Sequence, residues 1–274
     1  MTKLATLRID GTTRAVRLDG DTHVDLGYAD LGAYLAAGSP EPAADAARYP
    51  VEGADFAPVV PDPSKVLCVG HNYRNHIQEM GRELPSYPTV FPKFADTLLG
   101  ANDDIVKPAE TDALDWEVEL VVVIGTQVRR ATEEQAVAAI AGFTVMNDVS
   151  VRDWQFRTIE WTQGKIWDSS TPVGPYVVTP DEVGGVRPSL QVTTTVDGRV
   201  MQQDDTATLL FDPVFLVRYL STIVTLRPGD LIATGTPAGV GHARDPKVYL
   251  VGGETVVTEI AGLGACTNRV VKDA

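Results

Sequence analysis

Two glutamates interrupt a stretch of sequence that otherwise has the composition of a buried strand. Glu117 and Glu119 lie in DWEVELVVVIG, residues 115–125, beside and within a run of Val, Leu and Ile. Residues two apart in a strand point to the same face, so both carboxylates must share one side. Like charges repel in a low dielectric, and a buried carboxylate without a partner costs several kcal/mol or becomes protonated. The pair therefore needs either solvent or a cation.

A third carboxylate follows a later apolar segment, FTVMN, which is suited to a neighbouring strand. A strand–helix–strand unit would return Asp148 to the side of Glu117 and Glu119. Carboxylates that converge in this way suit a hard divalent cation, Mg²⁺ first, with Mn²⁺ or Ca²⁺ as alternatives. No His or Cys accompanies the three acids, which disfavours zinc. The other interpretation is that the two glutamates lie on a solvated edge strand, where alternating charges are common.

A histidine and a glutamate in GHNYRNHIQEMG have the spacing of a helical pair. His76 and Glu79 would share one helix face, because residues three apart are neighbours on a helix. A carboxylate beside an imidazole fixes its tautomer and raises its basicity, which suits a general base that activates water. An exposed ion pair on the surface is the alternative interpretation.

A polar segment rich in aromatic residues, VRDWQFRTIEWTQGKIWDSSTPVGP, follows the third carboxylate. It carries Arg152, Gln155, Lys165 and Asp168. Lys165 is either a surface lysine, as most lysines are, or a buried cation that offsets the three acids and an anionic substrate.

The elements that would position these residues follow from periodicity and turn signals. Residues 3–26 alternate apolar and polar around Asp-Gly pairs, which predicts a small antiparallel meander. A short helix is predicted at LGAYLAAG, and residues 38–65 have the Pro-, Ala- and Asp-rich composition of a linker. The clearest helix is RRATEEQAVAAIAGF, with a capping box between Thr132 and Gln135 and Gly142 near its end.

The second half of the chain predicts further strands and one more helix. LQVTTTVDGRVMQQ has the pattern of a hairpin, and FDPVFLVRYLSTIVTL that of a helix with Asp212 as N-cap and Pro213 at its first position. The last segment, ETVVTEIAGLGACTNRVV, predicts closing strands. We therefore predict a mainly β fold with some helices (α+β). Residues 1–62 would form a small β-rich N-terminal domain with its linker, and residues 63–274 the catalytic domain.

Composition excludes several classes of partner. The formal net charge of −14 argues against nucleic acid, because phosphate binding needs a basic face. Cys68 and Cys266 are the only cysteines, which indicates a reducing compartment rather than a disulfide framework. The N-terminus lacks the apolar core of a signal peptide, and no apolar run approaches the roughly 20 residues that span a bilayer. We expect a cytoplasmic protein with neither nucleic-acid nor membrane partners.

From about Lys65 to Gly241 the chain resembles the fumarylacetoacetate hydrolase family. The resemblance rests on six motifs in family order: GHNYRNHIQE, VFPKFADTLLG, DWEVELVVVIG, NDVSVRDWQ, GKIWDSSTPVGP and GDLIATGTPAGVG. It implies a mixed β-sandwich roll and a homodimer. Family members commonly carry an apolar residue where this chain has His71, which is either a polar group of the pocket or a core histidine satisfied by the backbone.

The resemblance also implies a role for each candidate residue. It implies a divalent metal held by Glu117, Glu119 and Asp148, and a dyad of His76 and Glu79 on a mobile lid. It further implies that Lys165 is a catalytic cation. The substrate-binding residues that it implies are Arg152, Gln155, Thr236 and Lys93.

The chemistry of such a site depends on what leaves the substrate. A metal with two open positions can chelate a 2-oxo or 1,3-dicarbonyl acid and stabilise an enolate, with Lys165 as a fixed cation nearby. If an acyl group leaves, water must attack and His76 is the base. If carbon dioxide leaves, no water is needed. If nothing leaves, a proton transfer interconverts enol and keto forms.

We therefore expect a metal-dependent hydrolase that cleaves a C–C bond in acylpyruvate-like or 3-oxo acid substrates. The alternative is a decarboxylase or an enol–keto isomerase of oxaloacetate or a hydroxymuconate-type diacid. A third possibility is a pseudoenzyme, a binding module whose ion only stabilises the fold. The dyad and Lys165 argue against this module, because a purely structural ion requires neither of them.

Overall fold

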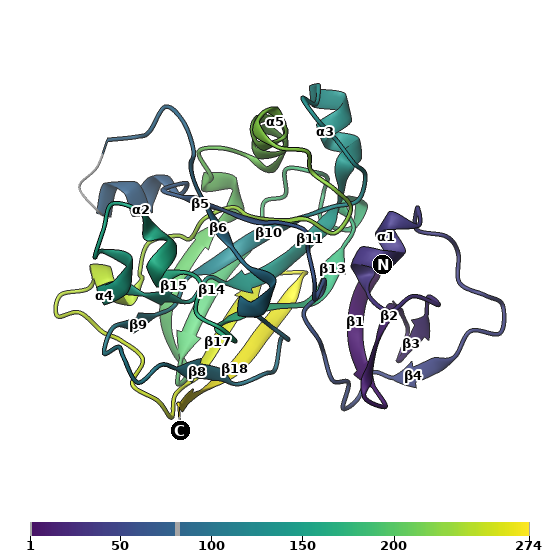
Figure 1. Cartoon of the computed structure of the whole chain (residues 1–274), viewed down its shortest axis with the longest axis horizontal. Helices are drawn as coiled ribbons and strands as arrows, with labels where there is room; N and C mark the ends of the chain where they lie inside the picture. The colour runs from purple at the N-terminus through teal and green to yellow at the C-terminus, as the bar shows by residue number, and fades with distance from the viewer. Residues whose placement is uncertain (1, 80–82, 274) are drawn as a thin grey trace.

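The computed structural model describes residues 2–79 and 83–273, except for the side chains of His76, Gln78 and Glu79. The described chain is mainly β, as predicted, and is built on two large sheets with short helices around them (Figure 1). Among the described residues, no helix has the length and apolar character needed to cross a membrane.

The N-terminal strands form a lobe that extends the larger sheet. The predicted meander is confirmed, because its successive strands pair antiparallel. Its first strand also pairs with a strand of the main body, with Lys3 opposite Val178 (Figure 1). The elements of this lobe are β1 (Lys3–Ile9), β2 (Thr12–Asp19), β3 (Thr22–Asp25), α1 (Leu31–Ala36) and β4 (Arg48–Pro50).

The segment predicted to be a linker, residues 38–65, contains a short strand and buried residues. It contains β4, which pairs with β3, and Phe56 forms an antiparallel bridge with Leu7. Val59 and Val60 are buried in the core beneath the lobe. The sequence did not predict β4, because a strand of only three residues is too short to show a period of two.

The larger sheet continues from the lobe into the main body. Its order is β4-β3-β2-β1-β13-β11-β10-β16-β5-β6, and β7 also pairs with β13. The strands of the main body in this sheet are β5 (Val66–Gly70), β6 (Thr89–Lys93), β7 (Leu98–Leu99), β10 (Val118–Ile124), β11 (Ile140–Asn147), β13 (Thr171–Val178) and β16 (Leu231–Ala233).

β10 is buried on both faces, which explains its almost uninterrupted apolar sequence. Leu120 and Val122 belong to the core between the two sheets and α5 (Pro213–Ile223). Val121 and Val123 belong to the core on the opposite face. Glu119 lies two residues before Val121 and therefore on the same face of β10. On this face the apolar core ends and acidic side chains begin near the start of the strand.

The second sheet packs on the first and completes the body. Its order is β15-β14-β17-β18-β8, and the predicted hairpin turns at Asp197 and Gly198, which both have positive φ. The strands outside the larger sheet are β8 (Ile105–Lys107), β14 (Gln191–Val196), β15 (Arg199–Asp205), β17 (Thr255–Ile260) and β18 (Gly264–Lys272), with a separate pair of β9 (Leu114–Asp115) and β12 (Ser150–Val151).

The helices begin as predicted, but one ends early. In α5 the N-cap is Asp212, with Pro213 at the first position, and in α3 (Glu133–Ala139) the capping box of Thr132 and Gln135 is present. The predicted helix over residues 129–143 was too long, because the chain enters β11 at Ile140. The remaining helical elements are α2 (Arg74–Glu79), α4 (Arg152–Gln155), η1 (Ala95–Thr97), η2 (Trp161–Gly164), η3 (Pro180–Glu182), η4 (Thr206–Thr208) and η5 (Gly241–Ala243).

Candidate metal centre and active site

The three predicted carboxylates converge at one end of the β10–β11 pair. The antiparallel register sets Val118 opposite Asn147, so Glu117 and Asp148 follow at neighbouring positions. The backbone N–H of Asp148 donates to the carbonyl oxygen of Glu117 at 2.8 Å. One carboxylate oxygen from each of Glu117, Glu119 and Asp148 lies within 4.8 Å of the others, and all three residues are buried. The alternative of a solvated edge strand is therefore wrong.

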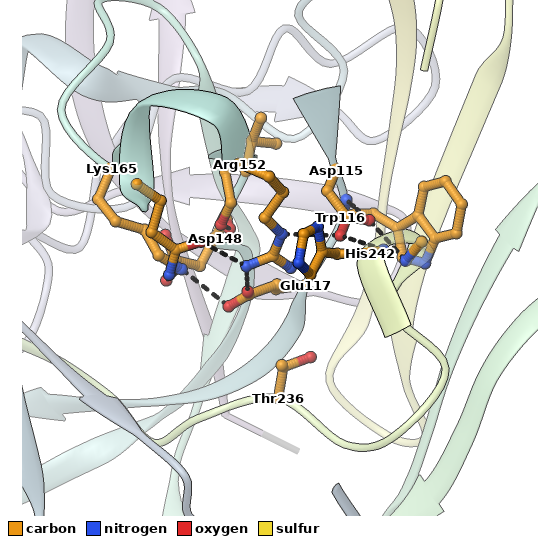
Figure 2. Close-up of polar contacts among 12 residues, drawn as sticks. Asp115, Trp116, Glu117, Asp148, Arg152, Lys165, Thr236 and His242 are labelled. Carbon is orange, nitrogen blue, oxygen red and sulfur yellow. Dashed lines mark hydrogen bonds and ion pairs between the residues drawn. The ribbon is translucent and has the colours of Figure 1, made fainter. Parts of the chain in front are cut away.

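Three buried cations surround two of these carboxylates, and two of the cations, Lys165 and Arg152, are labelled in Figure 2. Lys165 Nζ bridges Glu117 Oε2 at 2.9 Å and Asp148 Oδ2 at 2.7 Å. Lys93 Nζ contacts the other oxygen of Asp148 at 2.7 Å, and Arg152 Nη1 lies 2.6 Å from Glu117 Oε1. Burial acts to lower the pKa of Lys165, but the charges of Asp148 and Glu117 outweigh it and raise the pKa, so the ammonium stays charged.

Glu119 differs from the other two acids in its partners. Its Oε2 accepts a hydrogen bond from the backbone N–H of Gly235 at 2.8 Å, and in the described chain no lysine or arginine pairs with it. Burial, followed by the charges of Asp148 and Glu117, raises the pKa of Glu119 well above its ordinary value. A buried carboxylate that converges with two others and has no cation of its own fits a hard divalent ion, since all the donors are carboxylate oxygens.

Asp115 organises the residues around the three acids, and the sequence reasoning missed it. Its Oδ1 accepts from the backbone N–H groups of Trp116 at 2.9 Å and Gly241 at 2.7 Å. Its Oδ2 accepts from Arg152 Nε at 2.8 Å and from the backbone N–H of His242 at 2.9 Å (Figure 2). Asp115 therefore fixes both the guanidinium and the η5 loop. The available signal was its position as the first acid of DWEVE.

A pocket opens beside the acids, with an apolar wall and a polar wall. Its apolar wall consists of Val69, Phe91, Phe156, Trp161 and Val240. Its polar wall includes Glu117, Glu119, Lys165, Arg152, Gln155 and Thr236. Three of the predicted substrate-binding residues therefore line this pocket.

The fourth predicted substrate-binding residue, Lys93, lies elsewhere. Its side chain is fully buried, and its Nζ contacts Asp148 Oδ1 and the carbonyl oxygen of Val149. Lys93 is not among the described residues that line the pocket. This position suits a residue that orients Asp148, and its contact with substrate stays a prediction.

Two glycines allow the elements of the pocket wall to pack closely against one another. A Cβ atom at Gly164 would lie 2.4 Å from Cβ and 2.6 Å from the backbone nitrogen of Gln155, so only glycine lets η2 pack on α4 and deliver Lys165. A Cβ at Gly70 would lie 2.2 Å from the ring of Trp161. The contact with Gln155 explains why glycine precedes Lys165 in the sequence.

Two histidines, His71 and His242, line the pocket, and a third, His76, was predicted to act there. His71 lines the pocket and packs edge-on against Trp161 with ring centroids 5.0 Å apart, which supports the first of its two predicted positions. His242, to which the sequence assigned no role, lines it too. The backbone of His76 and Glu79 lies in α2, but their side chains are outside the described part of the chain. Their dyad stays a prediction, as does the lid, which includes residues 80–82.

Comparison with known proteins places this site in a family. The model of the fumarylacetoacetate (FAA) hydrolase C-terminal family matches residues 65–271. The human mitochondrial oxaloacetate tautomerase FAHD2A is 43% identical over 232 residues, which cover 82% of this chain and 73% of that protein.

Solved structures share the whole fold. A fumarylacetoacetate hydrolase from the psychrophile Exiguobacterium antarcticum is 33% identical, with a TM-score of 0.90 and complete coverage of both chains. The 2-hydroxyhepta-2,4-diene-1,7-dioate isomerase from Mycobacterium marinum is 30% identical, with a TM-score of 0.81 over all of both chains. The similarity therefore includes the N-terminal lobe as well as the main body.

The raised pKa of Glu119 predicts how the stability of the metal-free protein depends on pH. A folded pKa above the unfolded value means that the folded state binds more protons, so the contribution of Glu119 is present below the unfolded pKa and is lost as pH rises through the folded pKa. Relative to Glu119→Gln, the wild type should lose free energy of unfolding as pH rises above about 4.5, by at most about 1.4 kcal/mol per pH unit.

This prediction is checked by urea denaturation of both proteins in EDTA at a series of pH values. Added Mg²⁺ should stabilise the wild type, more at higher pH, and should have little effect on Glu119→Gln. A free-energy difference between the two proteins that stays constant with pH would contradict the prediction.

The packing at Gly164 predicts that Gly164→Ala impairs the site. The added Cβ must displace the backbone of Gln155 or η2 itself, which moves Lys165 away from Glu117 and Asp148. Overpacking of this kind costs about 1–3 kcal/mol, and we expect turnover to fall at least tenfold. The matched control is Gln163→Ala at an exposed position in the same turn, which should keep both rate and melting temperature. Equal rates in the two variants would refute the packing argument.

Proposed function

The chain belongs to the fumarylacetoacetate hydrolase family, and we propose that it is a metal-dependent enzyme that interconverts the enol and keto forms of oxaloacetate or a similar short 2-oxo diacid. The observation that carries this proposal is the buried, charged Lys165, which lines the pocket and lies between two carboxylates of the acidic trio. The named activity of the human relative, which acts on oxaloacetate, supports the choice of substrate.

The acidic trio fits a divalent cation, with Mg²⁺ as the first candidate. A cation held by Glu117, Glu119 and Asp148 would bind the 2-oxo acid end of the substrate and lower the energy of negative charge on the enolate oxygen. The three acids and a divalent cation would still sum to a charge of −1, which Lys165, Lys93 and Arg152 offset before an anionic substrate binds.

Side chains of the pocket provide donors for the anionic substrate. Gln155 uses its Oε1 to accept from Arg152 Nη1 at 2.9 Å, which leaves its amide N–H groups for a ligand. Thr236 Oγ1 accepts from Gln202 Nε2 at 2.9 Å, so its own O–H proton is free to be donated into the pocket. These donors and Lys165 would hold a carboxylate and an enolate oxygen in fixed orientation before the proton moves.

Tautomerisation requires one proton to be exchanged at C3 of the substrate. When the keto form becomes the enol, C3 loses a proton to a base and the carbonyl oxygen gains one. The predicted base His76 would accept the proton from C3, with Glu79 holding its tautomer. No bond between carbon atoms breaks, and no water is consumed.

Hydrolysis of a C–C bond is the second candidate, and the named activity of the Exiguobacterium antarcticum structure favours it. The same donors would stabilise the enolate that leaves when an acyl group is lost. Hydrolysis makes one further demand, because water must be deprotonated as it attacks the acyl carbon. His76 would then act on water rather than on C3.

The proposal predicts Mg²⁺-dependent decay of the enol form of oxaloacetate, measured by its ultraviolet absorbance and abolished by EDTA. Lys165→Met should lower kcat/KM by about 10²–10³-fold, as expected when a fixed group that stabilises charge is removed. Lys272→Met, which removes an exposed lysine at the C-terminal end of β18, should have no effect. A wild-type rate equal to the spontaneous rate would refute the tautomerase, and a normal rate in Lys165→Met would refute the role of the lysine.

A second assay decides whether the enzyme hydrolyses C–C bonds. Acylpyruvate cleavage and oxaloacetate tautomerisation should be measured on the same preparations of wild type and His76→Ala. If hydrolysis is an activity of this protein, His76→Ala should lower it by about 10²–10⁴-fold, the usual contribution of general base catalysis. Absence of acylpyruvate cleavage in the wild type would eliminate the second candidate.

A further inference from the structure

Arg152 has one nitrogen without a partner in an otherwise saturated environment. Its Nε donates to Asp115, and its Nη1 contacts Glu117 and Gln155. Its Nη2 is buried and has no hydrogen-bond partner among the described residues. A buried cationic donor without an acceptor is costly, so such a group marks a place where an acceptor belongs. Arg152 lines the pocket, and that acceptor can therefore be supplied by a ligand.

His242 lies on the same wall and is held from two sides. Its backbone N–H donates to Asp115 Oδ2, the same oxygen that accepts from Arg152 Nε, so the two residues are adjacent (Figure 2). Its Nδ1 lies 2.8 Å from the hydroxyl of Tyr249. The ring of Phe156 packs against the imidazole with centroids 5.0 Å apart. The imidazole is thus oriented by the fold and not by the catalytic acids.

The contact with Tyr249 determines what His242 can offer a ligand. Burial, followed by the charges of Arg152 and Lys247, lowers the pKa of His242, so the ring is neutral at neutral pH. A neutral imidazole has one donor and one acceptor nitrogen. The hydroxyl of Tyr249 can donate to Nδ1, which leaves the proton on Nε2 and makes it a donor. An anionic group in the pocket favours this tautomer.

We propose that Arg152 Nη2 and His242 Nε2 form a subsite for the distal carboxylate of the substrate, and that His242 and Tyr249 set the preference for a diacid over a monoacid. This inference rests on the proposed function, in which the 2-oxo acid end occupies the acidic trio and Lys165. A diacid has a second charge that needs its own partners, and Arg152 and His242 supply them. Phe156 and Val240 also line the pocket and offer apolar surface to the carbon chain between the two ends.

The test compares two substrates that differ only at the distal end: oxaloacetate and its 4-methyl ester, in which the distal carboxylate is neutral. In the Mg²⁺-loaded enzyme, His242→Phe keeps a ring against Phe156 but removes the donor. It should lower kcat/KM for oxaloacetate about ten- to a hundredfold and leave that for the ester within about threefold, since a single hydrogen bond to a charged group contributes roughly this factor. Tyr249→Phe should give a smaller loss in the same direction. Equal losses on both substrates, or none, would overturn the subsite.

A binding measurement separates failure of the subsite from failure of the proposed function. Quenching of tryptophan fluorescence, to which Trp161 in the pocket wall should respond, gives dissociation constants for oxaloacetate and the ester with Mg²⁺ present. If the wild type does not tautomerise oxaloacetate but binds it more tightly than the ester, and His242→Phe loses this difference, the subsite stands without the tautomerase. If the difference is absent in the wild type or survives in His242→Phe, the subsite is refuted whatever the activity.

Discussion

The repulsion between carboxylates buried at one end of β10 is the constraint on which the structure of the site depends. Glu117 and Asp148 each need buried cations, and these come from distant parts of the chain: Lys93 from β6, Arg152 from α4 and Lys165 from the residue after η2. Each cation must stay charged although it is buried. For Lys165, the charges of Asp148 and Glu117 ensure this by raising the pKa of its ammonium group. Burial of unpaired charge would otherwise cost several kcal/mol per group.

The positions of the helices and strands around this centre follow from ordinary packing. Because β10 is buried on both faces, its side chains alternate between two apolar cores, and only its first residues reach the pocket. The lobe before residue 62 adds strands to the same sheet through β1 and β13. The predicted boundary at this point therefore separates segments of one continuous sheet, with β13 next to the β11 strand that leads to Asp148.

Sequence reasoning was most successful where the physical signal is local. Acids two residues apart in an apolar strand predicted the shared face of Glu117 and Glu119, and the capping box predicted the start of α3. It failed where contacts are distant in sequence. Asp115 accepts hydrogen bonds from the η5 loop, which lies more than a hundred residues later in the chain. The residue pattern of one segment cannot predict such a contact. The period of α3 likewise could not show that β11 begins at Ile140.

The anchoring of the η5 loop has an evolutionary consequence. The three acids lie at one end of the larger sheet and their cations on β6, on α4 and directly after η2, whereas His242 and Tyr249 lie on a separate loop between β16 and β17. The backbone of that loop is tied to the acidic centre, because Asp115 accepts from the N–H groups of Gly241 and His242 and Glu119 accepts from that of Gly235. These bonds do not depend on the side chains that the loop carries. Side chains of η5 and of the residues that follow it can therefore change during evolution while the backbone bonds that place the loop beside the acids are kept.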